Sequence, residues 1–231
     1  MVWPEALLYG LGNLWGYELI HNVLTDQDAN WIEKSGAAGA LGRMGKDAKL
    51  AFPSLYYLSI STYPGPEAEA AQEALEKIVG TGEDVIPDLL TELNSDQAEI
   101  RIYAVTALAW LHPDDPDIIE ALIKLLEKET DDRVKYSLLH AIAKYGERAK
   151  EAIPIMATLL NENQTMWIQD QIMKSLAEIG PQAIETVPTL IEYLEDDDWQ
   201  VVSQARFALE EITGESFGSD AEKWRLWWNS K

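Results

Sequence analysis

The chain has 231 residues, with 18 basic and 40 acidic side chains, so its formal net charge is -22. This charge repels nucleic acid, whose binding depends on Lys and Arg neutralising phosphates, and it disfavours anionic membrane surfaces. The sequence contains no cysteine, which excludes disulfides, thiolate nucleophiles and cysteine-based zinc sites. Hydrophobic residues make up 47% of the chain, enough to bury a core.

The first segment, residues 1–29, is apolar around Trp3 and Trp15 and carries Glu5 and Glu18 but no Lys or Arg. It therefore lacks the basic region of a signal peptide, although a signal removed earlier stays open, and we expect a cytoplasmic protein. No apolar run approaches the length of a membrane span. We expect this segment to cap the edge of the next helices, with a membrane-surface helix as the alternative.

A motif then recurs along the chain: a small residue with Leu or Ile, a Gly, a short polar link, and a Pro that opens an apolar run. It occurs in residues 40–55, 141–156 and 175–190. Its aliphatic anchors are 33 or 34 residues apart: Leu41, Leu75, Leu108, Ile142, Leu176 and Leu209. A fixed period of this size is the signature of a repeat architecture.

One period, residues 131–161, predicts a helical hairpin. An apolar stripe at helical spacing follows Asp131, a favoured N-cap residue, and ends at Gly146. Pro154 opens the second helix, where its missing N–H costs nothing. Neither helix can bury its face without neighbours.

The same features place the other helices. The predicted longer helices lie near residues 30–43, 67–79, 97–110, 131–145, 165–179 and 198–212. The predicted shorter helices lie near residues 53–60, 86–94, 117–127, 152–161 and 186–195. Ser219 or Asp220 can cap a last helix whose tryptophans we expect to pack on the last repeat. We predict one repeat domain over residues 1–231, with a cap at 1–29, repeats at 30–212 and a capping helix at 213–231.

The repeat resembles the HEAT-repeat family, and more closely its short bacterial form, the PBS-lyase HEAT-like repeats. The resemblance rests on an Asp, Val-Arg, Ala, Leu-Gly series, seen here as Asp96, Ile100-Arg101, Ala104 and Leu108. It covers residues 30–228 and implies an all-α, right-handed α-solenoid of about six helical hairpins with atypical terminal caps.

No residue pattern indicates catalysis or metal binding. The three histidines have no second His or Cys at ligand spacing, and the acidic clusters at 114–117 and 196–198 lack the Gly and terminal Glu of a calcium loop. Turn and N-cap roles explain those clusters more simply. We therefore expect no enzyme activity, no metal and no cofactor.

The resemblance implies that the longer helix of each hairpin lines the concave face, and helical spacing then selects the outward positions. The third and fourth of these helices put aromatic and basic residues there, a composition typical of interface hot spots. The predicted partner-binding residues are Arg101, Ile102, Thr106, Trp110, Lys135, Tyr136, His140 and Lys144. The tryptophans that recur near helix starts, Trp31, Trp167 and Trp199, are interpreted as packing between helices.

These observations predict a protein–protein interaction scaffold that binds another protein or a peptide on the concave face, with no nucleic acid as partner. Two alternatives stay open: an accessory subunit of a bilin-chromophore lyase or isomerase, which the family resemblance suggests, and a structural subunit of a larger assembly. The oligomeric state is not predicted.

Overall fold

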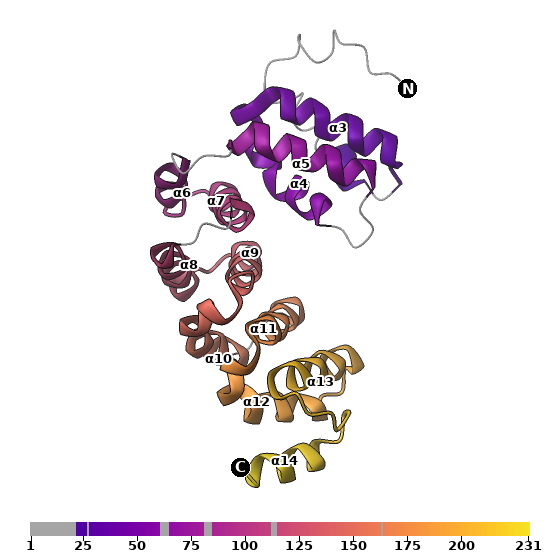
Figure 1. Cartoon of the computed structure of the whole chain (residues 1–231), viewed down its shortest axis with the longest axis vertical. Helices are drawn as coiled ribbons and strands as arrows, with labels where there is room; N and C mark the ends of the chain where they lie inside the picture. The colour runs from indigo at the N-terminus through magenta and orange to yellow at the C-terminus, as the bar shows by residue number, and fades with distance from the viewer. Residues whose placement is uncertain (1–21, 27, 61–64, 81–84, 112–114, 163) are drawn as a thin grey trace. The chain divides into compact units, whose positions relative to one another are not determined.

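The computed structural model describes residues 22–26, 28–60, 65–80, 85–111, 115–162 and 164–231 (Figure 1). All regular structure in these ranges is helical, which confirms the predicted all-α class. Trp3 and Trp15 of the expected N-terminal cap lie outside the described residues. The chain forms two compact units, residues 1–111 (unit 1) and residues 112–231 (unit 2).

The described part of unit 1 includes three long helices and two short ones. The long helices are α3 (Trp31–Met44), α5 (Pro66–Val79) and α7 (Ala98–Leu111), and the short ones are α4 (Phe52–Ser59) and α6 (Ile86–Glu92). Asn30 begins α3 with a capping box, because its side chain accepts from the backbone N–H of Glu33 while the Glu33 carboxylate accepts from the N–H of Asn30. Prolines open α4, α5 and α6, as the sequence predicts.

Small residues hold α3 and α5 together. Gly42 of α3 is buried, and a Cβ at this position would lie 3.0 Å from the Cα of Ala74 in α5. The facing surfaces are made largely of alanine, with Ala38, Ala71 and Ala74 almost completely buried. The two backbones can therefore approach closely, and little space is left between these helices.

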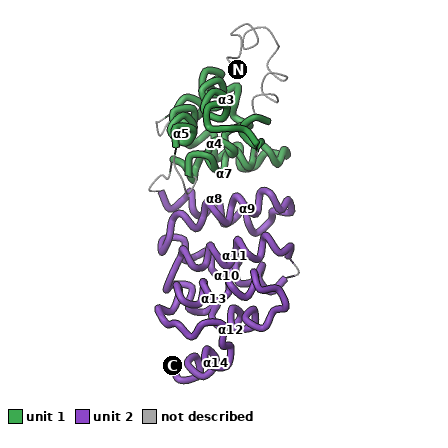
Figure 2. Tube along the Cα trace, turned by 90° about the vertical axis from the view of Figure 1, so that its right-hand side faces the viewer, with its two compact units in different colours: residues 1–111 green, residues 112–231 purple. Residues whose placement is uncertain are grey.

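Unit 2 consists of further helical hairpins (Figure 2). Their first helices are α8 (Pro116–Lys128), α10 (Ile153–Asn161) and α12 (Val187–Glu192), and their second helices are α9 (Asp132–Ala143), α11 (Met166–Ile179) and α13 (Trp199–Thr213). The second helix is the longer one except in the first of these hairpins, where α8 has 13 residues and α9 has 12. The predicted helices are confirmed, with most ends within one or two residues of the expected positions. Asp131 caps α9 by accepting from the N–H of Arg133, and Pro154 lies in the first turn of α10.

The short polar links of the motif are themselves helical, which the sequence did not predict. They form the 3₁₀ segments Gly45–Ala51, Gly146–Ala152 and Gly180–Thr186, each starting at a Gly with positive φ. The fourth residue of each link is a fully buried alanine: Ala48, Ala149 and Ala183. The links therefore belong to the core as well as to the connections.

Hydrogen bonds join neighbouring hairpins in unit 2. The Ser175 hydroxyl of α11 lies 3.1 Å from the carbonyl oxygen of Leu139 in α9, and it is completely buried. The Tyr193 hydroxyl donates to the carbonyl oxygen of Leu160 in α10. These bonds connect residues 36 and 33 positions apart in sequence, so they link equivalent places in successive repeats.

The C-terminal helix α14 (Ala221–Asn229) closes unit 2. Asp220 caps it by accepting from the N–H of Lys223, which is the capping role that the sequence predicts. Trp224 is completely buried, packs edge-on against Phe217, and donates its indole N–H to the carbonyl oxygen of Gly218. The expected packing of Trp224 is therefore confirmed.

Candidate functional site

The predicted partner-binding residues fall on two helices in different units, and each set is described by itself. On α7 of unit 1, Arg101 is half-buried and its guanidinium donates to the carbonyl oxygen of Ser95 at 2.8 Å. Ile102 is half-buried. Trp110 is also half-buried and packs edge-on against the core residue Phe52, with ring centroids 6.1 Å apart.

Thr106 does not face outward, and that part of the prediction is wrong. Its side chain is 1% exposed, and its hydroxyl donates back to the carbonyl oxygen of Ile102 at 2.8 Å. A Thr hydroxyl can be satisfied in this way inside a helix, so the residue is compatible with a fully packed position.

On α9 of unit 2, two of the four predicted residues form ion pairs. The Lys135 Nζ lies 3.5 Å from the Asp132 carboxylate, and the side chain is only 14% exposed. The Lys144 Nζ lies 3.9 Å from the carboxylate of Glu178, which belongs to α11. Both lysines are therefore near acidic groups of their own chain.

His140 is half-buried on the same helix. Burial, and secondarily the positive charge of Lys144, lower the pKa of His140 from 6.5 to about 4. The imidazole is therefore neutral at pH 7, and the cationic groups among the predicted residues of α9 are the two lysines.

Tyr136 connects the α9 set to the next long helix. Its ring lies against Trp167 of α11, with centroids 5.5 Å apart and an angle of 36° between the ring planes. Aromatic contacts of this kind stabilise by about 0.5–1.5 kcal/mol beyond area burial. They also hold a large side chain in one orientation while part of it stays accessible.

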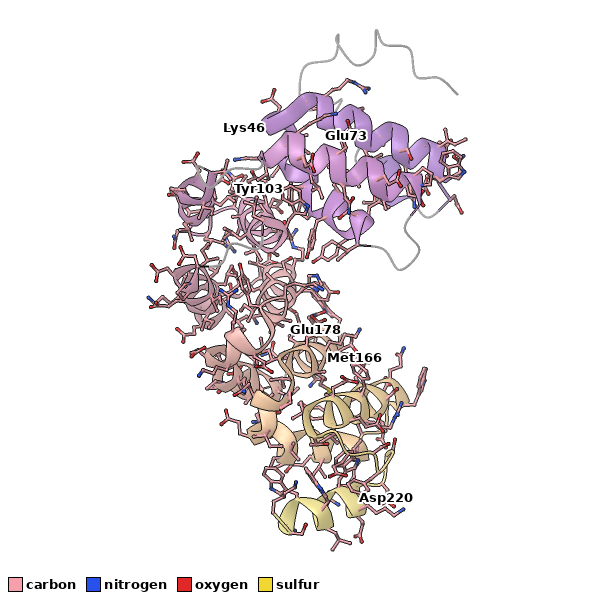
Figure 3. The ribbon with its side chains drawn as sticks, viewed as in Figure 1. Lys46, Glu73, Tyr103, Met166, Glu178 and Asp220 are labelled. Carbon is pink, nitrogen blue, oxygen red and sulfur yellow. The ribbon has the colours of Figure 1, made fainter. Side chains whose placement is uncertain are left out.

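The predicted packing between helices is wrong for Trp31 and Trp199, which are largely exposed, whereas Trp167 does pack against Tyr136 of α9. Trp199 is 75% exposed, Trp31 is 53% exposed, and Trp167 is 41% exposed despite its contact with Tyr136. Met166, labelled in Figure 3, begins α11 and is 51% exposed. Single exposed apolar side chains are common on protein surfaces, whereas neighbouring ones can mark a contact site, and Met166 and Trp167 are adjacent.

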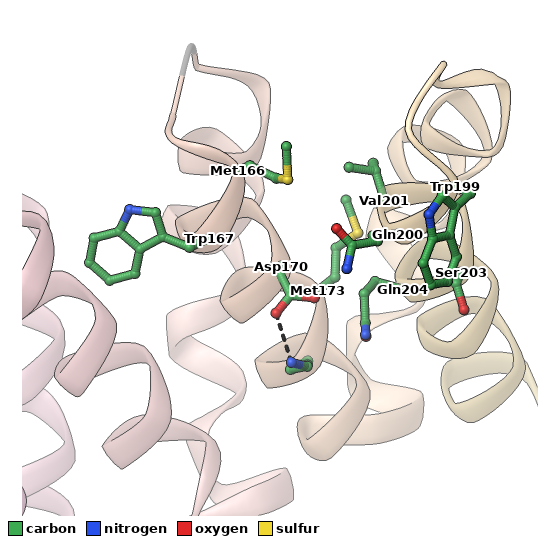
Figure 4. A pocket seen from close by; sticks show the side chains of 10 residues that line it. Met166, Trp167, Asp170, Met173, Trp199, Gln200, Val201, Ser203 and Gln204 are labelled. Atoms are coloured by element: carbon green, nitrogen blue, oxygen red, sulfur yellow. Dashed lines mark hydrogen bonds and ion pairs between the residues drawn. The ribbon is translucent and has the colours of Figure 1, made fainter. Parts of the chain in front are cut away.

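Three of these four residues border a groove between α11 and α13, with a volume of about 340 Å³ (Figure 4). One side is formed by Met166, Trp167, Asp170, Met173 and Lys174, and the other by Trp199, Gln200, Val201, Ser203 and Gln204. Met173 and Val201 are buried, so the groove has an apolar floor. In Figure 4, Trp167 points away from α13, to the side on which Tyr136 contacts it.

The polar groups of the groove are one ion pair, one hydroxyl and two amides. The Lys174 ammonium donates to the Asp170 carboxylate at 2.7 Å along the same helix. Ser203, Gln200 and Gln204 face this pair from the other side (Figure 4). Such a lining can hold an extended segment by hydrogen bonds while the aromatic rings contact its side chains.

The acidic loop before α13 has a structural role. Asp198 caps α13 by accepting from the N–H of Gln200 at 2.8 Å, and Asp196 accepts from the N–H of Asp198 at 2.8 Å. Asp115 caps α8 in the same way through the N–H of Asp117. The predicted turn and N-cap roles of these clusters are confirmed, and within the described ranges no group of three or more His, Cys, Asp or Glu side chains could hold a metal ion.

The groove was missed because the large apolar residues at its border precede the first buried aliphatic of their helices. Counting outward positions from Ile168 and Val201 leaves out Met166, Trp167 and Trp199. The available signal was the pair of bulky apolar residues, Met166 and Trp167, directly after the turn that precedes α11. Two such residues in the exposed first turn of a helix break the amphipathic pattern.

Comparison with known proteins finds a similarity over part of the chain. Residues 86–172 match the family model of HEAT repeats, and no curated protein sequence matches the chain. None of the described helices is both long and apolar enough to cross a membrane.

The fold is similar to that of solved repeat proteins. The crystal structure of Kap121p bound to Pho4p matches 93% of this chain and 27% of its own, with a TM-score of 0.57 and 14% identity. A Kap121p mutant gives a TM-score of 0.54 at 13% identity, over 86% of this chain and 26% of that one. An engineered protein gives 0.46 at 22% identity, over 85% and 97%. The chain spans about a quarter of the Kap121p length, and the fold class of HEAT and armadillo solenoids is confirmed.

Proposed function

We propose that this protein is a non-catalytic scaffold that binds a segment of a partner protein on the face formed by α9, α11 and α13. The observation that carries the proposal is the groove between α11 and α13, bordered by the exposed side chains of Met166, Trp167 and Trp199. Aromatic residues and Met are the residue types enriched where proteins bind one another.

Two further properties support this role. The groove side chains project from helices whose buried faces are packed in the core, so little conformational entropy is lost when a partner docks. The Tyr136–Trp167 contact also extends the aromatic surface from α11 to α9. A surface that crosses two helices suits an extended segment better than a small molecule.

Most of the residues predicted from sequence stay in the proposal. Tyr136 of α9 adjoins the groove through its contact with Trp167. Lys135, His140 and Lys144, which lie on α9 or at its C-cap, are kept as proposed contacts. Arg101, Ile102 and Trp110 on α7 of unit 1 are proposed as a separate set of partner contacts. Thr106 is left out because it is buried.

The family and fold add to the proposal. We propose that the repeats outside residues 86–172 belong to the same family, in its short bacterial form. Kap121p, which shares the fold, binds the protein Pho4p in its crystal structure. That partner belongs to Kap121p, and what is carried over is the use of a helical repeat surface to hold another protein.

The test is affinity capture from lysate of the source cells with three matched baits: the wild type, a Trp167→Ala, Trp199→Ala double variant, and Trp31→Ala. Trp31 begins α3 as Trp199 begins α13, so the third bait removes an equivalent exposed tryptophan far from the groove residues in sequence. Circular dichroism checks that all three baits are folded.

We expect a protein that is retained by the wild type and by Trp31→Ala and is lost with the double variant. A loss of at least about 2 kcal/mol in binding, roughly 30-fold in affinity, is typical of a central aromatic anchor. Retention of the same proteins by all three baits would overturn the groove as the binding site.

A further inference from the structure

The charge around the groove indicates the chemistry of the partner, if the groove binds a partner segment as proposed above. The two hairpins that form the groove carry a large excess of acidic side chains. Between residues 161 and 213 there are eleven acidic and two basic side chains. A surface with this balance attracts cations and repels anionic segments.

Each of the two basic side chains in this stretch pairs with one acidic residue of its own helix, so the remaining acidic residues are not neutralised by them. Lys174 pairs with Asp170 at 2.7 Å, and Arg206 pairs with Glu210 at 3.0 Å, both within a single helix. Glu178 and Glu195 are paired with Lys144 and Arg225 from outside the stretch. The other seven acidic residues stay in excess: Glu162, Glu185, Glu192, Asp196, Asp197, Asp198 and Glu211.

The aromatic borders of the groove favour the same kind of ligand. A Lys or Arg side chain lays its apolar stem on an indole ring and is attracted by the ring's negative face. The molecule already contains one such contact, because the Lys231 ammonium lies 4.6 Å from the centroid of Trp227. Trp199, at 75% exposed, offers its ring to a partner.

Asp170 supplies an acceptor within the groove. Its side chain is 34% exposed, and the ion pair with Lys174 uses one of its two carboxylate oxygens. A carboxylate can accept from two cationic donors at once, so a partner's ammonium or guanidinium can share it with Lys174.

We propose that the groove between α11 and α13 binds a basic segment of a partner protein, with a Lys or Arg stem against Trp199 and its charged end at Asp170. An acidic or phosphorylated segment is disfavoured by the same charges.

The test uses three capped synthetic peptides of one length that repeat Gly-Ser-X, with X as Lys, Gln or Leu, and measures fluorescence anisotropy of the labelled peptides. The proteins are the wild type, Trp199→Ala and Asp170→Asn, with Trp31→Ala and Glu185→Gln as matched controls. Glu185→Gln removes the same unit of charge as Asp170→Asn, from an exposed residue of a 3₁₀ link outside the groove lining.

We expect the Lys peptide to bind at least about tenfold more tightly than the others, and to weaken steeply as salt is raised. Trp199→Ala should reduce its affinity about tenfold and Asp170→Asn about threefold to fivefold, with both controls within about twofold of the wild type.

Other results in this experiment would overturn the site, the basic partner or the whole inference. Equal losses with Glu185→Gln and Asp170→Asn, or no loss with Trp199→Ala, would show attraction by net charge alone and overturn the site. Tightest binding of the Leu peptide, lost with Trp199→Ala, would overturn the basic partner and leave the groove as a docking surface. No binding by any peptide would overturn the inference, while the capture experiment would still decide the proposed function independently.

Discussion

Two pairs of consecutive long helices, α3 with α5 in unit 1 and α11 with α13 in unit 2, occupy the same place in the repeat but leave different surfaces. Gly42 and Ala74 bring α3 and α5 close together, whereas the larger residues Met173 and Val201 lie between α11 and α13 below an open groove. In both pairs the first helix has an exposed tryptophan in its first turn, Trp31 in α3 and Trp167 in α11. Small residues between two long helices therefore leave no groove beside the exposed tryptophan, whereas larger residues keep the helices apart and leave one.

The largest expected effect comes from removing the groove floor. Met173 is 1% exposed, so Met173→Ala loses buried apolar contact and leaves a cavity, and should lower the free energy of unfolding by about 2–4 kcal/mol. Urea denaturation measures this change. The control Met173→Leu keeps the volume and should cost less than about 1.5 kcal/mol. Equal losses for the two variants would contradict the role of volume at this position.

The close approach of α3 and α5 can be tested by adding volume where the two helices meet. Gly42→Val places a side chain 3.0 Å from the Cα of Ala74 and should destabilise by about 1–3 kcal/mol. Gly36 lies in the same helix with no atom within 4 Å of an added Cβ, so Gly36→Ala should stabilise by about 0.5–1 kcal/mol. Thermal unfolding of both variants distinguishes steric conflict from a general effect of losing glycine in α3.

Acid should weaken unit 2 through His140. Its pKa is lowered to about 4 in the folded chain, against an ordinary 6.5, so the unfolded chain takes up a proton first as pH falls. This contribution to stability is complete above about pH 6.5 and is lost progressively toward pH 4. After allowance for partial exposure we expect about 1–2 kcal/mol.

Urea unfolding at several pH values between about 7 and 4.5 tests this window. The His140→Gln variant does not titrate there, and its stability should change less over the same range. The pKa values of Asp131, Glu195 and Asp220 are lowered by hydrogen bonds from Arg133, Arg225 and Lys223. Their contributions are lost as pH falls through those lowered values, below the main part of the histidine window. A parallel pH dependence in wild type and variant would show that carboxylates dominate.

The smallest effect is expected for the ion pair in the groove. Asp170 and Lys174 are four residues apart on α11 and are 34% and 44% exposed, so Asp170→Asn should change stability by less than about 0.5 kcal/mol. Circular dichroism and thermal unfolding check this. If the change in stability is small, a loss of binding by Asp170→Asn can be assigned to the groove itself. A large change would mean that the ion pair supports the fold.

The helices could be predicted because the sequence marks both ends of each repeat. Glycines with positive φ, such as Gly180, end most of the long helices, and prolines such as Pro154 open the short ones, so local backbone chemistry fixes these boundaries. The 3₁₀ links were not predicted, because a polar stretch of seven residues between two helices indicates a turn. Their only signal is a buried alanine at the fourth position, as in Ala149.

The candidate site was harder to predict, because exposure depends on what the neighbouring repeat places beside a residue. Trp199 is at the start of its helix, a position that periodicity does not assign to either face, and it was interpreted as packing. Thr106 follows the outward spacing but lies in the interior, because the faces of α7 are covered along most of its length. Local pattern determines that a residue is in a helix, whereas tertiary packing determines what remains accessible.

The hydrogen bonds from Ser175 to Leu139 and from Tyr193 to Leu160 have a consequence for how such a chain changes over generations. Each bond joins residues about one repeat apart, so a hairpin depends on the correct spacing of its neighbour. Inserting or deleting a few residues inside a repeat moves the donor away from its acceptor. Gaining or losing one complete period keeps every donor opposite an acceptor, and duplication or loss of whole hairpins is therefore the change in length that this architecture tolerates best.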